Sequence, residues 1–234
     1  MELFGPEFWS ALLAIILIDL VLAGDNAIVI ALAARNLPPE MQRKAILWGT
    51  FGAIAVRVLI TMVVVWLLKI PGLMLLGGLG LLWIAVKLGA PAQPGGGAHV
   101  TPAATTFFGA MKTIVVADAL MGLDNVLAVA GAAHGSMLLV VLGLLISIPI
   151  VIWGSTFVLK ALERFPSIVY IGTAVLALTA VKMIMGEPMI SEWFEGRTML
   201  VWAAYGLGLA VVLSTTLALQ RRNELALIPV PQKK

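Results

Sequence analysis

The sequence predicts an all-α integral membrane protein, folded as a polytopic bundle of helices that cross the bilayer. The first observation is composition: hydrophobic residues make up 61% of the 234 residues and charged residues 12%, and the mean hydropathy is +1.07. Soluble domains are about half apolar and about a quarter charged. The second observation is that the apolar residues form runs of about 20, the length that crosses the hydrocarbon. The third is an internal repeat that contains every aspartate of the chain.

Seven apolar runs predict seven transmembrane helices, at roughly 8–34, 43–68, 71–90, 106–133, 136–160, 167–186 and 198–219. Residues 91–105 are rich in Gly, Pro and Ala and have no hydrophobic period, which is typical of a flexible linker. We therefore expect a three-helix repeat over 1–90, the linker over 91–105, a second three-helix repeat over 106–188, and an extra helix with a basic tail over 189–234.

The loops predict the orientation of the chain. Nine Lys and Arg residues fall on one side of the membrane, against Lys69 and Arg197 on the other. Because Lys and Arg concentrate in cytoplasmic loops, we expect the N-terminus outside the cell (inner or plasma) membrane and the C-terminus in the cytoplasm. The same placement explains the net charge of +3 without a nucleic-acid partner. The nine residues are Arg35, Arg43, Lys44, Lys160, Arg164, Arg221, Arg222, Lys233 and Lys234.

The internal repeat is a motif of the form D-x5-D-N. Asp19, Asp25 and Asn26 in the first helix return as Asp118, Asp124 and Asn125 in the fourth, 99 residues later. A second match has an offset of 95 residues and aligns Ala85-Val86-Lys87 with Ala180-Val181-Lys182. Because each repeat has an odd number of helices, the second copy enters from the opposite face, which predicts two inverted repeats. The seventh helix has no counterpart and is expected to be peripheral, as a structural addition or at an oligomer interface.

The repeated motif predicts a site for a hard cation near the middle of the membrane. An ionised carboxylate in hydrocarbon costs several kcal/mol unless it is paired, hydrated or bound to a metal. The alternative is that the aspartates only form buried ion pairs with Lys87, Lys182 and Arg57 that hold the bundle together, but such pairs add little net stability. Carboxylate and amide oxygens suit a divalent cation. The expected metal ligands are Asp19, Asp25, Asn26, Asp118, Asp124 and Asn125.

Helix geometry predicts a break beside the second aspartate of each motif. Six residues correspond to about 600° of rotation, so Asp19 and Asp25 would point about 120° apart in a straight helix. Gly24 and Gly122 precede the second aspartates, where unwinding would turn both carboxylates inward. The alternative is that the small residues there only permit close helix packing.

Three basic residues that are predicted to lie inside the membrane, Lys87, Lys182 and Arg57, are expected to compensate charge or to gate the site. Four aspartates and three cations give a formal charge of −1, which a divalent cation would change to +1. We therefore expect cation entry to be coupled to proton loss or to displacement of a basic group. Arg57 has no charged counterpart in the fifth helix, so it breaks the symmetry of the repeats.

The stretch DLVLAGDNAIVIALAARNLP and its partner DALMGLDNVLAVAGAA closely resemble the TerC family of integral membrane proteins. The resemblance covers the first six helices, and the chain is similar to the compact, seven-helix type. It implies a manganese exporter with Asp19, Asp25, Asn26, Asp118, Asp124 and Asn125 at the transport site. The family name refers to tellurite, but a carboxylate-lined site favours a cation over that oxyanion.

The leading interpretation is a secondary transporter that exports Mn²⁺ by alternating access. Oxygen ligands accept Mn²⁺, Mg²⁺ and Ca²⁺ alike, so the choice of manganese and the outward direction depend on the resemblance. The alternatives are export of another cation such as Ca²⁺, and an assembly or insertion factor that uses the charges only structurally. No enzymatic activity and no permanently bound cofactor are expected, because no nucleophile motif or His-rich ligand set is present. The expected partners are the transported cation, the lipid bilayer and a second copy of the chain.

Overall fold

The computed structural model describes residues 5–67, 70–90, 105–133 and 136–226, and these residues contain helices and no strand. The order of the helices agrees with the seven predicted runs, with one short helix, α7, in addition. The helices are α1 (Pro6–Ala34), α2 (Pro39–Leu67), α3 (Leu73–Gly89), α4 (Phe107–Ala132), α5 (Met137–Arg164), α6 (Ile168–Met185), α7 (Pro188–Ser191) and α8 (Thr198–Ala226).

The helix ends follow from local sequence signals. Pro6 and Pro39 occupy the first turns of α1 and α2. N–H groups in the first turn have no acceptor within the helix, so the missing N–H of proline costs no hydrogen bond there. Thr106 precedes α4, and its hydroxyl oxygen accepts a hydrogen bond from the N–H of Gly109 at 3.2 Å. Gly72 precedes α3 with a φ of +81°, a backbone conformation that favours glycine. Each of these signals positions the first turn of a helix.

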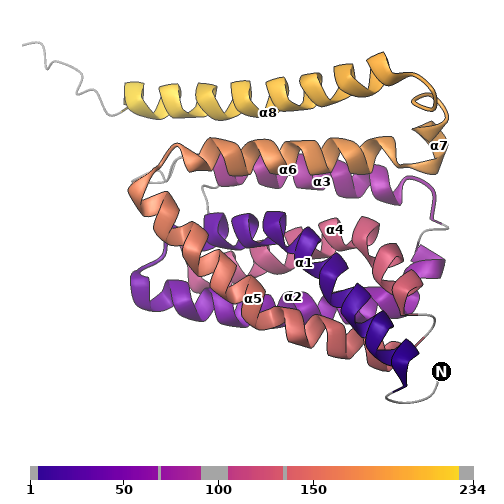
Figure 1. The fold of residues 1–234 in the computed structure, drawn as a ribbon. Helices are drawn as coiled ribbons and strands as arrows, with labels where there is room; N and C mark the ends of the chain where they lie inside the picture. Colours follow the sequence, from indigo (N-terminus) through magenta and orange to yellow (C-terminus); the bar gives the residue numbers. More distant parts are fainter. Residues whose placement is uncertain (1–4, 68–69, 91–104, 134–135, 227–234) are drawn as a thin grey trace, which may run out of the picture.

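Helices from the two halves of the chain pair with each other. The closest pairs are α1 with α5, α2 with α4, and α3 with α6, while α1 also contacts α4. Figure 1 shows α6 and α3 side by side in the middle of the bundle, and α8 running along the outside next to α6. The motif helices α1 and α4 therefore contact each other and helices of both halves of the chain.

Small residues permit close approach in these pairs. Gly143 of α5 faces the side chain of Ile15 on α1, and Gly49 of α2 faces Ile114 on α4. On α3, a Cβ atom added to Gly78 would lie 2.8 Å from the carbonyl oxygen of Ala180 on α6. Interfaces rich in small residues are typical of helices that pack in membranes.

Several of the helices are long and apolar enough to cross a membrane. Among the described residues, α2, α5, α6 and α8 meet this condition, which makes four spans, or five if the two segments of α1 are one span. Helix α3 is apolar but shorter, with 17 residues. The chain is thus an all-helical integral membrane protein.

Helix α1 is bent where a break was predicted. Its segments Pro6–Val21 and Gly24–Ala34 meet at an angle of 48°, and the bend is visible in Figure 1. The helix nevertheless continues through Asp25, so the expected unwinding is wrong for α1. Helix α4 also continues through Gly122. A bend changes the direction of the second half of α1 and keeps its backbone groups hydrogen-bonded, which avoids unpaired polar groups in hydrocarbon.

Candidate cation site around Arg57

A single arginine joins the two copies of the repeated motif. Arg57 of α2 donates from Nη1 to Asp19 Oδ1 of α1 at 2.6 Å. It donates from Nη2 to Asp118 Oδ1 and from Nε to Asp118 Oδ2, the latter at 3.3 Å. The guanidinium thus makes a two-pronged contact with Asp118 and a single contact with Asp19. The first aspartate of each motif therefore converges on one cationic group.

This cluster is enclosed by protein. The exposed fractions are 4% for Arg57, 2% for Asp19 and 7% for Asp118. The helix pairing accounts for the convergence, because α4 packs against both α1 and α2. The Ser147 hydroxyl of α5 lies near the Asp19 carboxylate. Two carboxylates and one guanidinium carry a formal charge of −1, so pairing reduces the cost of burial without removing the negative charge.

The second aspartate of α1 has a different environment. Asp25 is half-buried, and its Oδ1 accepts the N–H of Asn26 at 2.9 Å. Arg57 and Asp118 both lie close enough to interact electrostatically with it. Asp25 is therefore near the Arg57 cluster and more accessible than the two aspartates within it.

Asn26 supplies an unused oxygen next to the cluster. Its side chain is 4% exposed, and its Oδ1 has no hydrogen-bond partner among the described residues. Asn125, its counterpart on α4, is 9% exposed. A buried amide oxygen without a donor loses its hydration without compensation. Such an oxygen is an available ligand for a cation.

A narrow gap separates Asn26 from Asp118. The gap is too small to hold a water molecule and is also lined by Val29, Ile30, Ile114 and Met121. Among the described side chains, no group of three His, Cys, Asp or Glu residues is arranged to hold a metal ion. In this conformation the Arg57 guanidinium lies between Asp19 and Asp118, the first aspartates of the two motifs.

The remaining predicted site residues lie as follows. Lys87 is half-buried in the last turn of α3, with its Nζ 5.1 Å from the centre of the Trp83 ring. Lys182 is exposed on α6. Asp124 belongs to α4, but its side chain lies outside the described residues. Of the three basic residues named from the sequence, Arg57 is the one that lies between the motifs.

Sequence reasoning missed two features of this centre. Ser147 was not predicted, because a serine in an apolar helix most simply bonds the backbone one turn earlier, as Ser147 also does with Gly143 O at 3.1 Å. Ion pairs between the aspartates and Arg57 were considered only as the alternative interpretation, and the bridging of both motifs by this one arginine was not predicted. The symmetry break at Arg57 was the one signal that singled it out.

Membrane-length apolar helices around a buried, paired charge centre define an integral membrane protein with an intramembrane polar site, a feature common in ion pathways. The profile of the Integral membrane protein TerC family matches residues 4–224. The chain belongs to this family, which confirms the resemblance found in its motifs.

Curated relatives support the family assignment. The chain is 44% identical over 185 residues to "Uncharacterized membrane protein YjbE" of Bacillus subtilis (strain 168), covering 79% of this chain and 84% of the relative. It is 28% identical over 206 residues to "UPF0053 protein YegH" of Escherichia coli (strain K12), covering 81% of this chain but 38% of the relative. It is 24% identical over 195 residues to "UPF0053 inner membrane protein YgdQ" of the same strain, covering 77% of this chain and 82% of the relative. No solved structure gives a significant match.

Proposed function

We propose that the chain is a secondary transporter that exports a divalent metal cation, Mn²⁺ in particular, by alternating access. The observation that carries the proposal is the convergence of Asp19 and Asp118, one from each motif, on a single cationic group inside the bundle. The unpartnered Oδ1 of Asn26 supplies a further oxygen nearby. The cation would be held by Asp19, Asp25, Asn26, Asp118, Asp124 and Asn125, with Arg57 as its competitor.

Displacement of Arg57 is the step that the geometry suggests for cation entry. A divalent cation would bring two charges to a centre where the guanidinium supplies one, so binding favours release of the guanidinium or of a proton. The choice of Mn²⁺ over Ca²⁺ and the outward direction rest on the family resemblance, since oxygen ligands accept both ions.

The proposed architecture is two inverted three-helix repeats followed by α8. In an inverted repeat, α1 corresponds to α4, α2 to α5 and α3 to α6. The contact between α1 and α5 then has its counterpart in the contact between α4 and α2, and the contact between α3 and α6 is its own counterpart. That relation supports a two-fold axis between the halves. Helix α3, with 17 residues, would be about 26 Å long against a hydrocarbon thickness of about 30 Å, so we count it as a span.

The proposed location is the inner or plasma membrane, with the N-terminus outside. The balance of basic residues supports the orientation. The name of the Escherichia coli relative YgdQ places that protein in the inner membrane.

The same ion pairs support a second candidate, an assembly or insertion factor in which the charges serve only the fold. Flux in liposomes that contain the purified chain as their sole protein distinguishes the two. Uptake or release of Mn²⁺ above that of protein-free liposomes is expected for a transporter. A folded protein without flux of Mn²⁺ or Ca²⁺ would favour the structural role.

A cellular experiment tests the site. Cells under manganese stress would express the wild type, Asp25→Asn or Asp124→Asn, and their manganese would be measured by elemental analysis. We expect lower manganese with the wild type alone. Asp25 is half-buried, so its replacement should leave folded protein in the membrane. His99→Ala, in the predicted linker, is the matched control and should behave as the wild type. Full export by both aspartate variants would contradict the proposed site.

A further inference from the structure

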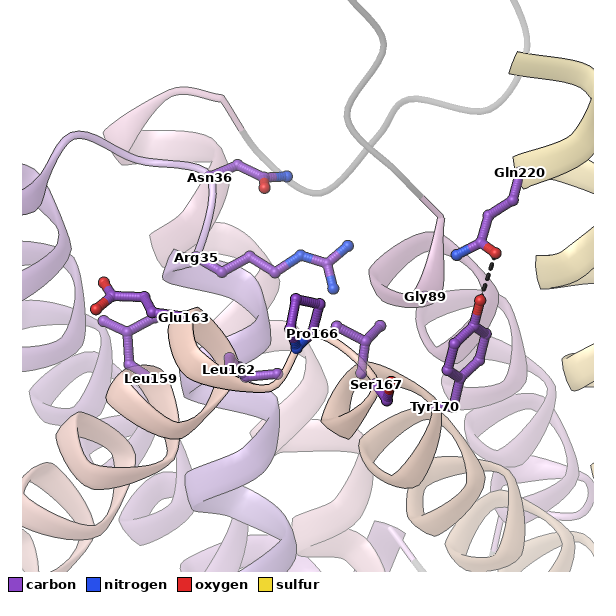
Figure 2. A pocket seen from close by; sticks show the side chains of 11 residues that line it. Arg35, Asn36, Gly89, Leu159, Leu162, Glu163, Pro166, Ser167, Tyr170 and Gln220 are labelled. Carbon is purple, nitrogen blue, oxygen red and sulfur yellow. Dashed lines mark hydrogen bonds between the residues drawn. The ribbon is translucent and has the colours of Figure 1, made fainter. Parts of the chain in front are cut away.

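A cavity lies at the C-terminal end of α1. It has a volume of about 530 Å³ and is bounded by the end of α1, the end of α3, the turn between α5 and α6, and α8. Figure 2 shows Arg35, Ser167, Tyr170 and Gln220 around it, with Leu162 and Pro166 on its apolar wall. Arg35 is ten residues after Asp25, which is about 15 Å along a helix. The cavity is therefore separate from the Arg57 cluster.

Arg35 lines this cavity, and its guanidinium is only partly hydrogen-bonded. Its Nη2 donates to the carbonyl oxygen of Ala90 at 2.9 Å, while its buried Nη1 has no hydrogen-bond partner among the described residues. Burial lowers the pKa of Arg35 from its usual range, because the guanidinium loses hydration. No acidic side chain forms an ion pair with Arg35 within the described ranges. In Figure 2 the Glu163 carboxylate points away from the guanidinium.

A carboxylate caps the N-terminus of α3, whereas no side chain caps the N-terminus of α6. The buried carboxylate of Glu187 accepts the backbone N–H groups of Gly72, Met74 and Leu75 at 2.9, 3.1 and 3.3 Å. At the repeat offset of 95 residues, these positions correspond to Ser167, Val169 and Tyr170, which line the cavity. The position 95 residues before Glu187 is Ala92, which has no carboxylate.

The first turn of α6 is closed in a different way. The N–H groups of Val169 and Tyr170 donate to the carbonyl oxygens of Pro166 and Ser167, both at 3.1 Å. No side chain caps this end of the helix. The cavity thus combines a cation without an ion-pair partner in the described part of the chain, a hydroxyl group at Ser167, and a helix N-terminus whose dipole favours negative charge.

We propose that this cavity binds a phosphate group, with the Arg35 guanidinium as its main contact, supplied by a phospholipid headgroup or as free phosphate. The planar fork of arginine matches phosphate geometry, and basic pockets between membrane helices commonly bind anionic headgroups. The apolar wall at Leu162 and Pro166 suits the glycerol and upper acyl part of a lipid. This inference does not depend on the proposed transport function.

The test is the thermal stability of the full-length chain purified in detergent. Inorganic phosphate is titrated against chloride at matched ionic strength, and separately phosphatidylglycerol is titrated against phosphatidylcholine. We expect one or both phosphate sources to raise the Tm of the wild type. Arg35→Gln should raise the half-saturating concentration of phosphate or phosphatidylglycerol about ten- to a hundredfold, because it removes hydrogen bonds from a charged donor. Arg43→Gln, an exposed arginine on α2, is the matched control and should leave binding unchanged.

A second variant keeps the inference testable if Arg35→Gln folds poorly. Glu163 is exposed and contributes the negative charge at the cavity. Glu163→Gln should therefore tighten binding about two- to fivefold, the range of an exposed charge interaction. A response to inorganic phosphate identifies free phosphate as a source, and a response confined to phosphatidylglycerol identifies the lipid. Absence of both responses in the wild type, or equal responses in wild type and Arg35→Gln, would overturn the assignment.

Discussion

Replacement of Arg57 by methionine tests the central feature of the site. The substitution removes all three contacts of the guanidinium with Asp19 and Asp118 and leaves two carboxylates that are 2% and 7% exposed. Removing one partner of a buried ion pair costs about 3–5 kcal/mol, because the remaining charge is uncompensated. For a chain of this length, that loss corresponds to a fall in Tm of about 6–20 °C.

The same substitution should make the protein respond more strongly to its cation. Without the guanidinium, a divalent ion has no competitor at Asp19 and Asp118, so Mn²⁺ should raise the Tm of Arg57→Met more than that of the wild type. The assay is thermal unfolding of the purified protein in detergent, with and without Mn²⁺. Arg43→Met, on an exposed position of the same helix, is the control and should change neither value.

Neutralising the carboxylates should reverse the loss. Adding Asp19→Asn and Asp118→Asn to Arg57→Met removes the uncompensated charges. The Tm of the triple variant should therefore rise most of the way back to the wild-type value, and Mn²⁺ should no longer raise it. A fall of less than 2 °C in Arg57→Met, or a triple variant no more stable than the single one, would refute the electrostatic account of this centre.

Two further predictions concern the frame of the bundle. Gly78→Ala should lower stability by about 1–3 kcal/mol, because the new Cβ meets the Ala180 carbonyl at 2.8 Å and the Ile184 side chain. Gly206→Ala on α8 meets nothing within 4 Å and should be neutral or more stable, so equal losses in both variants by thermal unfolding would contradict the packing argument. Glu187→Gln should lower stability by about 1–3 kcal/mol, because three backbone N–H groups lose a charged acceptor. The exposed Glu192→Gln should leave Tm unchanged, and a Glu187 variant as stable as that control would be the contrary result.

Most of the helical frame could be predicted from hydrophobicity alone. Apolar runs located every long helix to within a few residues, because a membrane leaves the backbone little alternative to the helix. The ends were less certain: α5 continues to Arg164 and α8 to Ala226, beyond the apolar runs, since polar residues extend a helix outside the hydrocarbon. The short helix α7 has only four residues and gives no periodic signal.

Bending and unwinding could not be distinguished from the sequence. Gly24 indicated a weak point in α1, and the 48° angle lies beside it. The helix nevertheless continues through that point, and α1 packs against α5 and α4. Tertiary packing of this kind cannot be derived from the glycine alone. The repeat offset alone likewise gave no distance between motif residues.

The sequence identified the residues of the candidate site, but it gave no information on the contacts between them. The two motifs identified Asp19 and Asp118 as important, and Arg57 was identified as a charge within the bilayer. Their direct contact depends on how α2 packs against α4, which is a tertiary property. Arg35 was considered only for topology, because its unpaired Nη1 depends on neighbours that are distant in the sequence.

A carrier that works by alternating access must also return to its starting state without its cargo. Arg57 is a cation tethered to the protein, and it would accompany Asp19 and Asp118 on that return, so the unloaded centre would carry less uncompensated charge while it reorients. Cargo would then bind only as the guanidinium withdraws. Under the proposed cycle, one side chain would therefore both permit the empty return and set the ion concentration at which export begins.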